Sequence, residues 1–407
     1  MPDSQKKAII LPRLKKSGLA IDDVKSYRPI SNLTFVSKLI EKVVAKQLIA
    51  YLESNQLLPR LQSGFRRGHS TETAVIRVLR DIYEAIDSGN VALLAMLDVS
   101  AAFDTVDHGV LLERLATSYG ISGAAHSWIM SYLTSRVQTV RFGKSDAAIS
   151  VLVKGVPQGS VLGPLLYVLY TADVVDVVES LGLNCHLYAD DIQLYSYCNI
   201  GMSHELANKT TAATMLVSDW MLANGLKLNV DKTQFMWFGT RQKLGGVEEY
   251  MKPVKDLGIW LDPFLTMSDH VKNLCRSCFY QLRQIRGIRK YLTPESLTTL
   301  MHSFVCSRID YCNNVLYGAS SYLLNYLQSL LNTSARIIAG VFKYDTIASF
   351  VRNELHWLPI HHRINYKIAM ITRDCLVGVG PQYLQNLIKR VLSVAGRGTL
   401  RSAKRGK

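Results

Sequence analysis

The chain has 407 residues, which is room for about two to three domains and excludes a peptide hormone or a disulfide-stapled mini-protein. Hydrophobic residues make up 48% and charged residues 19%, so the composition is that of a globular protein rather than a disordered one. The net charge of +15 favours a polyanionic partner, either nucleic acid or an anionic membrane surface.

Cysteine usage and the N-terminus bear on the cellular compartment. The seven cysteines suit the reduced thiols of an intracellular protein better than a disulfide framework. The N-terminal residues lack the apolar stretch and cleavage site of a signal peptide. No uninterrupted apolar run reaches the roughly 18 residues that a membrane span needs. We therefore expect an intracellular chain without a membrane partner, in either the nucleus or the cytoplasm.

Two helices are predicted in the first ninety or so residues. Ser37 fits an N-cap, and the apolar residues that follow it at helical spacing are Leu39, Ile40, Val43, Val44, Leu48 and Leu52. Ser70 fits the start of the second helix, and Gly89 fits the glycine that follows its last turn.

Short apolar runs and helices alternate in the next part of the chain. Residues 91–97 are continuously apolar and too short for an independent helix, which predicts a strand buried on both faces. Two strands are predicted at 137–142 and 150–153. After a turn at 155–160, Pro164 is expected to open an apolar helix that stops near Gly182.

The same alternation continues to about residue 238. A strand, a turn and a strand are predicted within 185–195, then a helix that ends near Asn224 and Gly225, and then a strand over 233–238. The predicted class is α+β, with a sheet backed by helices.

From about Met267 the chain is predicted to be mostly helical. Residues 270–286 contain no acid, and their apolar positions recur at steps of four and three: Val271, Cys275, Cys278, Leu282 and Ile285. A basic stripe lies one position along: Lys272, Arg276, Phe279, Arg283 and Arg286. Such a face can follow a phosphate backbone, and a merely solvated face is the alternative. Because Cys275 and Cys278 fall on the apolar stripe, core thiols are favoured over zinc ligands.

Acidic residues stand at the ends of two predicted strands. Asp98 follows the strand at 91–97, and Asp190 and Asp191 lie at the tip of the hairpin within 185–195. A desolvated carboxylate is costly unless it is paired or holds a metal. If the two strands are neighbours, the three carboxylates converge, and Mg²⁺, which prefers such oxygen ligands, would relieve their repulsion. Two such ions serve in-line phosphoryl displacement, so the pattern favours nucleotidyl transfer.

Five blocks of the sequence resemble motifs of reverse transcriptases, in the order of that family. Residues 188–191 (Tyr-Ala-Asp-Asp) are similar to the Y-x-D-D box. Residues 98–108 resemble the first catalytic motif in the form found in non-LTR (LINE-like) retrotransposons, close to the jockey and CR1 groups. Residues 155–164 resemble the Pro-Gln-Gly segment, and residues 26–33 and 62–71 resemble the finger motifs. Together the blocks are far more specific than a single Asp-Asp pair.

The resemblance implies an α+β right-hand polymerase, with fingers, a palm that holds an antiparallel sheet, and a mostly helical thumb. The reverse transcriptase domain would span about residues 1–265, with the fingers beginning in 1–90 and the palm and interleaved finger elements in 91–265. The thumb would follow at 266–345, and 346–407 would be an extension with a basic, mobile tail.

The resemblance also implies the roles of the acidic residues. Asp98 and Asp190 would ligate two Mg²⁺ ions, with Mn²⁺ as a possible substitute. Asp191 would complete the cluster, and the Val99 carbonyl would assist. Lys232 matches a lysine that is a candidate proton donor to pyrophosphate, and an ordinary solvated lysine is the alternative.

Further roles concern the nucleotide and the nucleic acid. Phe103 would be the steric gate against a 2′-hydroxyl, and Gln158 and Gly159 would contact the incoming nucleotide and template base. Arg28 and Arg66 are candidates for the triphosphate, with Arg67 an alternative to Arg66. The residues expected on the primer and template strands are Gly258 and Trp260, in a primer-gripping hairpin, and Lys272, Arg276, Arg283 and Arg286 on the thumb.

The implied activity is that of an RNA-directed DNA polymerase, which copies an RNA template into DNA by adding dNTPs to a DNA primer. The endonuclease usually encoded upstream in such elements is not found in this sequence, so nicking would have to come from elsewhere. An inactive relic that binds RNA, a polymerase of the group II intron or telomerase-like branch, and a metal-dependent nuclease are the alternatives. The string at 103–108 argues against the second, and the gate and hairpin matches argue against the third.

Overall fold

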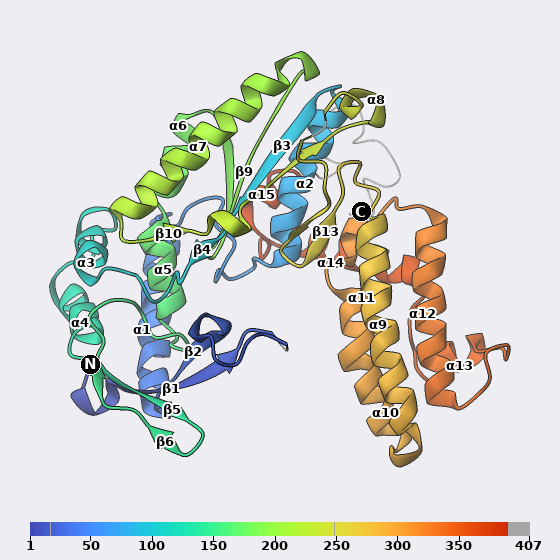
Figure 1. Cartoon of the computed structure of the whole chain (residues 1–407), viewed down its shortest axis with the longest axis horizontal. Helices are drawn as coiled ribbons and strands as arrows, with labels where there is room; N and C mark the ends of the chain where they lie inside the picture. Colours follow the sequence, from blue (N-terminus) through green and yellow to red (C-terminus); the bar gives the residue numbers. More distant parts are fainter. Residues whose placement is uncertain (17, 248, 390–407) are drawn as a thin grey trace. The chain divides into compact units, whose positions relative to one another are not determined.

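The computed structural model describes residues 1–16, 18–247 and 249–389, and the chain divides into two compact units (Figure 1). Unit 1 consists of Met1–Arg67, Ala95–Ser196 and His204–Thr233, and unit 2 of Gly68–Leu94, Tyr197–Ser203 and Gln234–Lys407. The boundaries of these units differ from those of the expected fingers, palm and thumb, because residues 68–94 group with the C-terminal part of the chain. The expected basic tail, from Lys389 to Lys407, lies outside the described residues except for Lys389. No described helix combines the length and the apolar character that crossing a membrane requires.

Unit 1 mixes helices and strands, in agreement with the expected α+β class. Its helices are α1 (Phe35–Ser54), α3 (His108–Thr117), α4 (Gly123–Leu133), α5 (Gly163–Thr171), α6 (Val174–Ser180) and α7 (Ser203–Ala223). Its strands are β1 (Lys7–Leu14), β2 (Tyr27–Asn32), β4 (Val99–Ser100), β5 (Val137–Phe142), β6 (Ser145–Asp146), β7 (Ser150–Val151), β8 (Asn184–Tyr188), most of β9 (Asp191–Cys198), and β10 (Lys227–Leu228).

Unit 2 is mostly helical. Its helices are α2 (Thr71–Asp87), α8 (Arg241–Leu244), α9 (Ser268–Ile288), α10 (Pro294–Met301), a π-helical turn (His302–Cys306), α11 (Ser307–Asp310), α12 (Ser321–Ala339), α13 (Ala348–Asn353), α14 (Ile360–Leu376) and α15 (Gln382–Gln385). Its strands are the first part of β3 (Val91–Leu97), β11 (Gln234–Phe238), β12 (Val254–Asp256) and β13 (Ile259–Leu261).

A four-stranded sheet in the order β11–β3–β9–β8 carries the candidate site. Strand β3 is almost wholly buried, which confirms the prediction of a strand covered on both faces. Strands β8 and β9 pair antiparallel, with Tyr188 opposite Asp191, so that Ala189 and Asp190 form the turn between them. A second sheet, in the order β2–β1–β5–β6, holds β1 and β2 antiparallel and β1 and β5 parallel. Strands β4 and β10 pair separately, just after Asp98.

Most predicted elements near the site are confirmed. Helix α2 begins at Thr71 with Ser70 as its N-cap in a reciprocal capping box. Helix α7 ends at Ala223, and Gly225 has the positive φ of +68° that a helix terminus needs. On α9 the apolar stripe is buried, including the free thiols of Cys275 and Cys278, as expected for core cysteines.

The predicted start of α1 is wrong, and its buried face is only partly as predicted, since Leu48 and Leu52 are buried but other apolar positions are not. Thr34 caps the helix instead of Ser37, because the Thr34 hydroxyl accepts a hydrogen bond from the Ser37 N–H at 3.1 Å. Leu39 and Val43, expected in the core, are exposed. The helix buries the side that holds Glu41, whose fully buried carboxylate accepts hydrogen bonds from the Ser37 hydroxyl and from two backbone N–H groups at the start of α5.

The apolar helix predicted from Pro164 to Gly182 is divided into α5 and α6. At the break, the guanidinium of Arg114 donates a hydrogen bond to the carbonyl of Tyr170, an acceptor that a continuous helix would use internally. Arg114 also pairs with Asp173, the residue just before α6, at 3.0 Å. A charged side chain from α3 therefore ends α5, which periodicity within residues 164–182 could not predict.

Candidate active site

Asp98 and Asp190 line one cleft of unit 1, of about 1110 Å³. Asp98 follows β3, and Asp190 lies in the turn between β8 and β9. Strands β3 and β9 are neighbours in the sheet although they are distant in the sequence (Figure 1), and this pairing brings the two residues to one cleft. The lining residues that were predicted from the sequence are Arg28, Asp98, Val99, Phe103, Gln158, Asp190 and Lys232. Asp191, Gly159 and Arg66 are not among them.

Asp98 lies close enough to Asp190 to affect the protonation of Asp190. Partial burial raises the pKa of Asp190, and the charge of Asp98 raises it further, whereas Arg28 and Lys232 act in the opposite direction. The buried hydroxyl of Tyr167 has a raised pKa for the same reasons: desolvation first, then the charges of Asp190, Asp191 and Asp98. Burial and the neighbouring acids therefore both disfavour ionisation of Asp190 and of the Tyr167 hydroxyl.

Asp98 is held by the segment that follows β10. Its backbone carbonyl accepts a hydrogen bond from the Asn229 N–H at 2.8 Å. Its side-chain Oδ2 accepts one from the Lys232 ammonium, also at 2.8 Å. Because Lys232 remains largely exposed, with 63% of its side chain accessible, a ligand in the cleft can compete with this ion pair.

The donor set suits a hard divalent cation. Asp98 and Asp190 supply carboxylate oxygens, and the raised pKa of Asp190 shows that further positive charge would stabilise its ionised form. Within the described residues, however, no three or more His, Cys, Asp or Glu side chains form a ready-made metal site. The remaining ligands of a bound ion would therefore be backbone carbonyls, water or substrate phosphates, which is the usual coordination of Mg²⁺.

Phe103 and Gln158 are placed by contacts across the cleft. The ring of Phe103 packs against Tyr167, with centroids 4.9 Å apart, and edge-on to Phe65 at 6.3 Å. The Gln158 side-chain amide donates a hydrogen bond to Asp104 at 2.8 Å, a partner that the sequence did not reveal. Gly159 has a φ of +119°, and a Cβ there would come within 2.7 Å of the Ser31 carbonyl, so only glycine fits this approach to β2.

Arg28 and Arg66, both predicted to bind a triphosphate, lie in different surroundings. Arg28 is exposed on β2 and lines the cleft. Arg66 folds back, and its guanidinium donates hydrogen bonds to the carbonyls of Pro59 at 2.6 Å and Gln62 at 3.1 Å. These contacts make Arg28 the stronger triphosphate candidate and give Arg66 a part in bracing its own loop.

The residues predicted to hold primer and template strands belong to unit 2. Gly258 lies between β12 and β13 with a φ of +91°, against the ring of Tyr311. The backbone N–H of Trp260 donates a hydrogen bond to Nδ1 of His270 at 3.4 Å. The basic side chains of α9 are all exposed, as predicted: Lys272, Arg276, Arg283 and Arg286.

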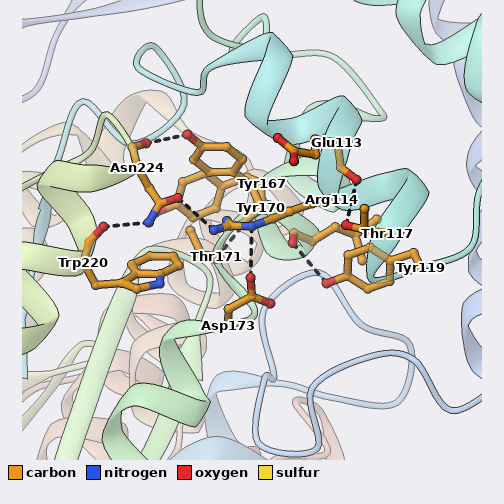
Figure 2. Close-up of polar contacts among 11 residues, drawn as sticks. Glu113, Arg114, Thr117, Tyr119, Tyr167, Tyr170, Thr171, Asp173, Trp220 and Asn224 are labelled. Atoms are coloured by element: carbon orange, nitrogen blue, oxygen red, sulfur yellow. Dashed lines mark hydrogen bonds and ion pairs between the residues drawn. The ribbon is translucent and has the colours of Figure 1, made fainter.

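A cluster around Arg114 in unit 1 was missed by the sequence analysis (Figure 2). The guanidinium donates a hydrogen bond to the Asn224 side-chain oxygen at 2.8 Å and lies about 5 Å from the ring centroids of Tyr170 and Trp220. The Tyr170 hydroxyl in turn contacts the Asn224 carbonyl. The cluster therefore fixes the end of α7, from which the chain leads through β10 to Lys232. An arginine on an apolar helix face was the only signal available in the sequence.

Two acids from separate strands, in a cleft that also presents cations, are the groups that a site for a phosphate-bearing substrate and a divalent metal would need. The reverse transcriptase (RNA-dependent DNA polymerase) family matches residues 14–261, and the chain belongs to this family. It is 32% identical over 366 residues to a probable RNA-directed DNA polymerase from transposon BS of Drosophila melanogaster. The matched region covers 83% of this chain and 38% of that protein.

A further relative and a solved structure are also similar. The chain is 29% identical over 356 residues to the RNA-directed DNA polymerase from mobile element jockey of Drosophila melanogaster, with the same coverage of 83% and 38%. A structure of apo telomerase from Candida tropicalis is 12% identical, covers 95% of this chain and 70% of that one, and has a TM-score of 0.49. The curated relatives confirm the resemblance to non-LTR retrotransposons. The chain spans less than half of their length.

Proposed function

We propose that this chain is an RNA-directed DNA polymerase that adds dNTPs to a primer 3′-hydroxyl along an RNA template, as the polymerase part of a non-LTR retrotransposon. The observation that carries the proposal is the meeting of Asp98 and Asp190 in one cleft with Arg28, Phe103, Gln158 and Lys232. Membership of the reverse transcriptase family supports the same activity.

The acids would hold the metal ions of this reaction. Asp98 and Asp190 are the carboxylate ligands, with Asp191 and the Val99 carbonyl as further donors. When bound, two Mg²⁺ ions would supply activation of the primer hydroxyl and stabilisation of the leaving pyrophosphate. Lys232 would hold a proton near the leaving group, since its ammonium already lies against Asp98.

The other cleft residues would select and orient the nucleotide. Arg28 would bind the triphosphate, because its exposed guanidinium faces the cleft and reduces the negative potential at Asp190. Gln158 and Gly159 would contact the base pair, and the ring of Phe103 would occupy the place of a 2′-hydroxyl. If so, Phe103→Ala should admit rNTPs, measured as the ratio of dNTP to rNTP incorporation, and an unchanged ratio would remove this role.

The nucleic acid would be held by basic and aromatic residues of unit 2. The exposed cations of α9 would contact phosphates, and the hairpin that contains Gly258 and Trp260 would contact the primer strand.

Extension of a DNA primer on an RNA template with dNTPs and Mg²⁺ tests the proposal. Asp190→Asn should lower the rate by at least about 1,000-fold, because it removes a metal ligand at the reacting atoms. Asp176→Asn, an exposed aspartate on α6, is the matched control and should extend like the wild type. RNA binding without synthesis by the wild type would indicate a relic, and strand cleavage would indicate a nuclease.

A further inference from the structure

The turn that presents Asp190 has an unusual backbone conformation. Ala189, the residue just before Asp190, has a φ of +58°, in the left-handed region that non-glycine residues rarely occupy. Its side chain is buried, with 8% exposed. Such a conformation persists only where neighbouring groups enforce it, and it lies next to a candidate metal ligand.

Gln62 is the group that contacts this turn. Its side chain is fully buried, and its Oε1 accepts hydrogen bonds from the N–H of Ala189 at 3.0 Å and from the N–H of Gly64 at 2.7 Å. Gly64 presses against the same turn, since a Cβ at position 64 would overlap the backbone nitrogen of Ala189. One amide oxygen therefore joins two backbone segments that are distant in the sequence.

The segment that carries Gln62 is fixed against the edge of β8. The Ser63 N–H donates to the Leu187 carbonyl, and the Leu187 N–H donates to the Leu61 carbonyl, each at 2.8 Å. The Arg66 guanidinium closes the loop from the other side through the Gln62 carbonyl. These bonds place the Gln62 side chain independently of any ligand in the cleft.

The hydrogen bonding of the Gln62 side chain also indicates that its oxygen, rather than its nitrogen, has the structural role. Within the described residues its Nε2 has no hydrogen-bond partner, although it is buried. A buried amide with a satisfied acceptor and an unused donor is costly to keep for packing alone. An apolar side chain of the same size would avoid that cost but would leave the Ala189 N–H without an acceptor.

We propose that Gln62 is a positioning residue for the reaction: its side-chain oxygen holds Ala189 in the left-handed conformation and so fixes Asp190 opposite Asp98. This inference rests on the proposed polymerase function. Gln62 touches neither substrate nor metal, and it acts through the backbone of the turn. Its loss should therefore impair metal binding and the chemical step rather than nucleotide recognition.

The test compares Gln62→Met, which removes the acceptor, with Gln62→Glu, which keeps an acceptor of the same length. In primer extension, Gln62→Met should lower kcat by about 10- to 100-fold with KM for dNTP changed by less than about threefold, as a misplaced catalytic group does. Mn²⁺ binding, followed by electron paramagnetic resonance of the free ion, should weaken toward that of Asp190→Asn. Gln62→Glu should retain most of both properties.

A double variant separates positioning from folding. Glycine adopts a positive φ readily, so Ala189→Gly should make the turn less dependent on Gln62 and restore about three- to tenfold of kcat in the Gln62→Met background. Thr210→Val, which removes another buried side-chain hydrogen bond of unit 1, is the control for general destabilisation and should leave kcat and Mn²⁺ binding unchanged.

Several outcomes would overturn the inference. Wild-type kcat and Mn²⁺ binding in Gln62→Met would do so, as would a loss confined to KM. A loss that follows the melting temperature and that neither Gln62→Glu nor Ala189→Gly relieves would assign Gln62 to the core. If the wild type does not extend primers at all, the polymerase proposal fails, and the Mn²⁺ comparison alone still decides whether Gln62 positions the acids.

Discussion

Arg114 and Asp98 are charged residues of the same unit, but their charges are satisfied to very different degrees. Arg114 contacts Asp173, the Asn224 side chain, the Tyr170 carbonyl and two aromatic rings, and only 13% of its side chain is exposed (Figure 2). Asp98 has one cationic partner, Lys232, and its side chain is 27% exposed.

The difference separates a charge that is enclosed by the fold from one that is left open to a ligand. The Arg114 guanidinium is largely enclosed by these protein partners, which leaves little of it for a substrate to bind. Burial raises the pKa of Asp190 and the charge of Asp98 raises it further, whereas Arg28 and Lys232 lower it. An acid with a raised pKa that lines a cleft, as Asp190 does, is typical of functional sites. Four substitutions test this comparison.

The largest effect is expected for Arg114→Met, on stability. Removing one partner of a largely buried charged cluster should lower the free energy of unfolding by about 3 kcal/mol, because Asp173 and Asn224 lose their partner. Activity per folded molecule should change by less than about threefold, since Arg114 is not in the cleft. Urea unfolding and primer extension at low temperature measure the two quantities.

Arg141→Met is the matched control for Arg114. Arg141 pairs with Asp146 through two hydrogen bonds, but both side chains are exposed. Exposed pairs contribute little, so the unfolding midpoint should hardly move. Equal losses in the two variants would contradict the view that burial and complete contacts distinguish the Arg114 cluster.

Lys232→Met should have the opposite profile. Loss of a group that supplies a proton should lower kcat by about 100-fold, or roughly 2.7 kcal/mol of activation free energy. The melting temperature should not fall, because the Lys232 side chain is 63% exposed. Lys209→Met, an exposed lysine on α7, is the control. Normal kcat with a lower melting temperature would place Lys232 with Arg114 as a residue of the fold.

Asp98, Lys232 and Arg114 also show which residues can be predicted from the sequence alone and which cannot. Asp98 and Lys232 were found because a buried strand that ends in an acid is a local signal and because short motifs resemble a family. Arg114 was not found, because its partners lie elsewhere in the chain and the apolar residues beside it on α3 were the only local indication of burial. Local patterns identify groups that are unusual for their own element, whereas tertiary contacts decide which ordinary residues become essential.

The errors have the same physical origin. Ser37 is a good N-cap residue, but it lies inside α1 because its hydroxyl serves the buried carboxylate of Glu41. Gln62 lies in residues 62–71, which resemble a finger motif, but its proposed role depends on Ala189, which is 127 positions away in the sequence. Strand β3, by contrast, was predicted correctly, because its uninterrupted run of apolar residues already indicates burial on both faces.

His270 in unit 2 differs from both Arg114 and Asp98, because it is a buried titratable group whose surroundings favour its neutral form. Burial lowers the pKa of His270 to about 4, and its Nδ1 accepts the Trp260 N–H. Because the unfolded imidazole titrates near 6.5, the folded state is favoured above about pH 6.5 and loses stability as the pH falls toward 4. Between about pH 7 and 5 the loss should be about 2 kcal/mol.

His270→Gln should remove this part of the pH dependence, since a glutamine oxygen can accept the Trp260 N–H and does not titrate. Urea unfolding at the two pH values measures the change. His204→Gln, at an exposed position on α7, should keep the wild-type dependence. If His270→Gln keeps the full pH dependence, other groups are responsible for it.

The basic residues of α9 have no compensating partner at all, which should make them sensitive to salt. Lys272, Arg276, Arg283 and Arg286 are exposed and form no ion pair within the residues that the structure describes. Arg276→Gln combined with Arg283→Gln should weaken template–primer binding modestly and reduce the slope of log K against log salt by about 1.5 to 2, since each phosphate contact releases counterions.

The control pair, Lys343→Gln with Arg352→Gln, is also exposed but lies off α9, and its slope should equal that of the wild type. Equal reductions in both pairs would mean that net charge alone draws nucleic acid to this chain, and that the stripe is a solvated face.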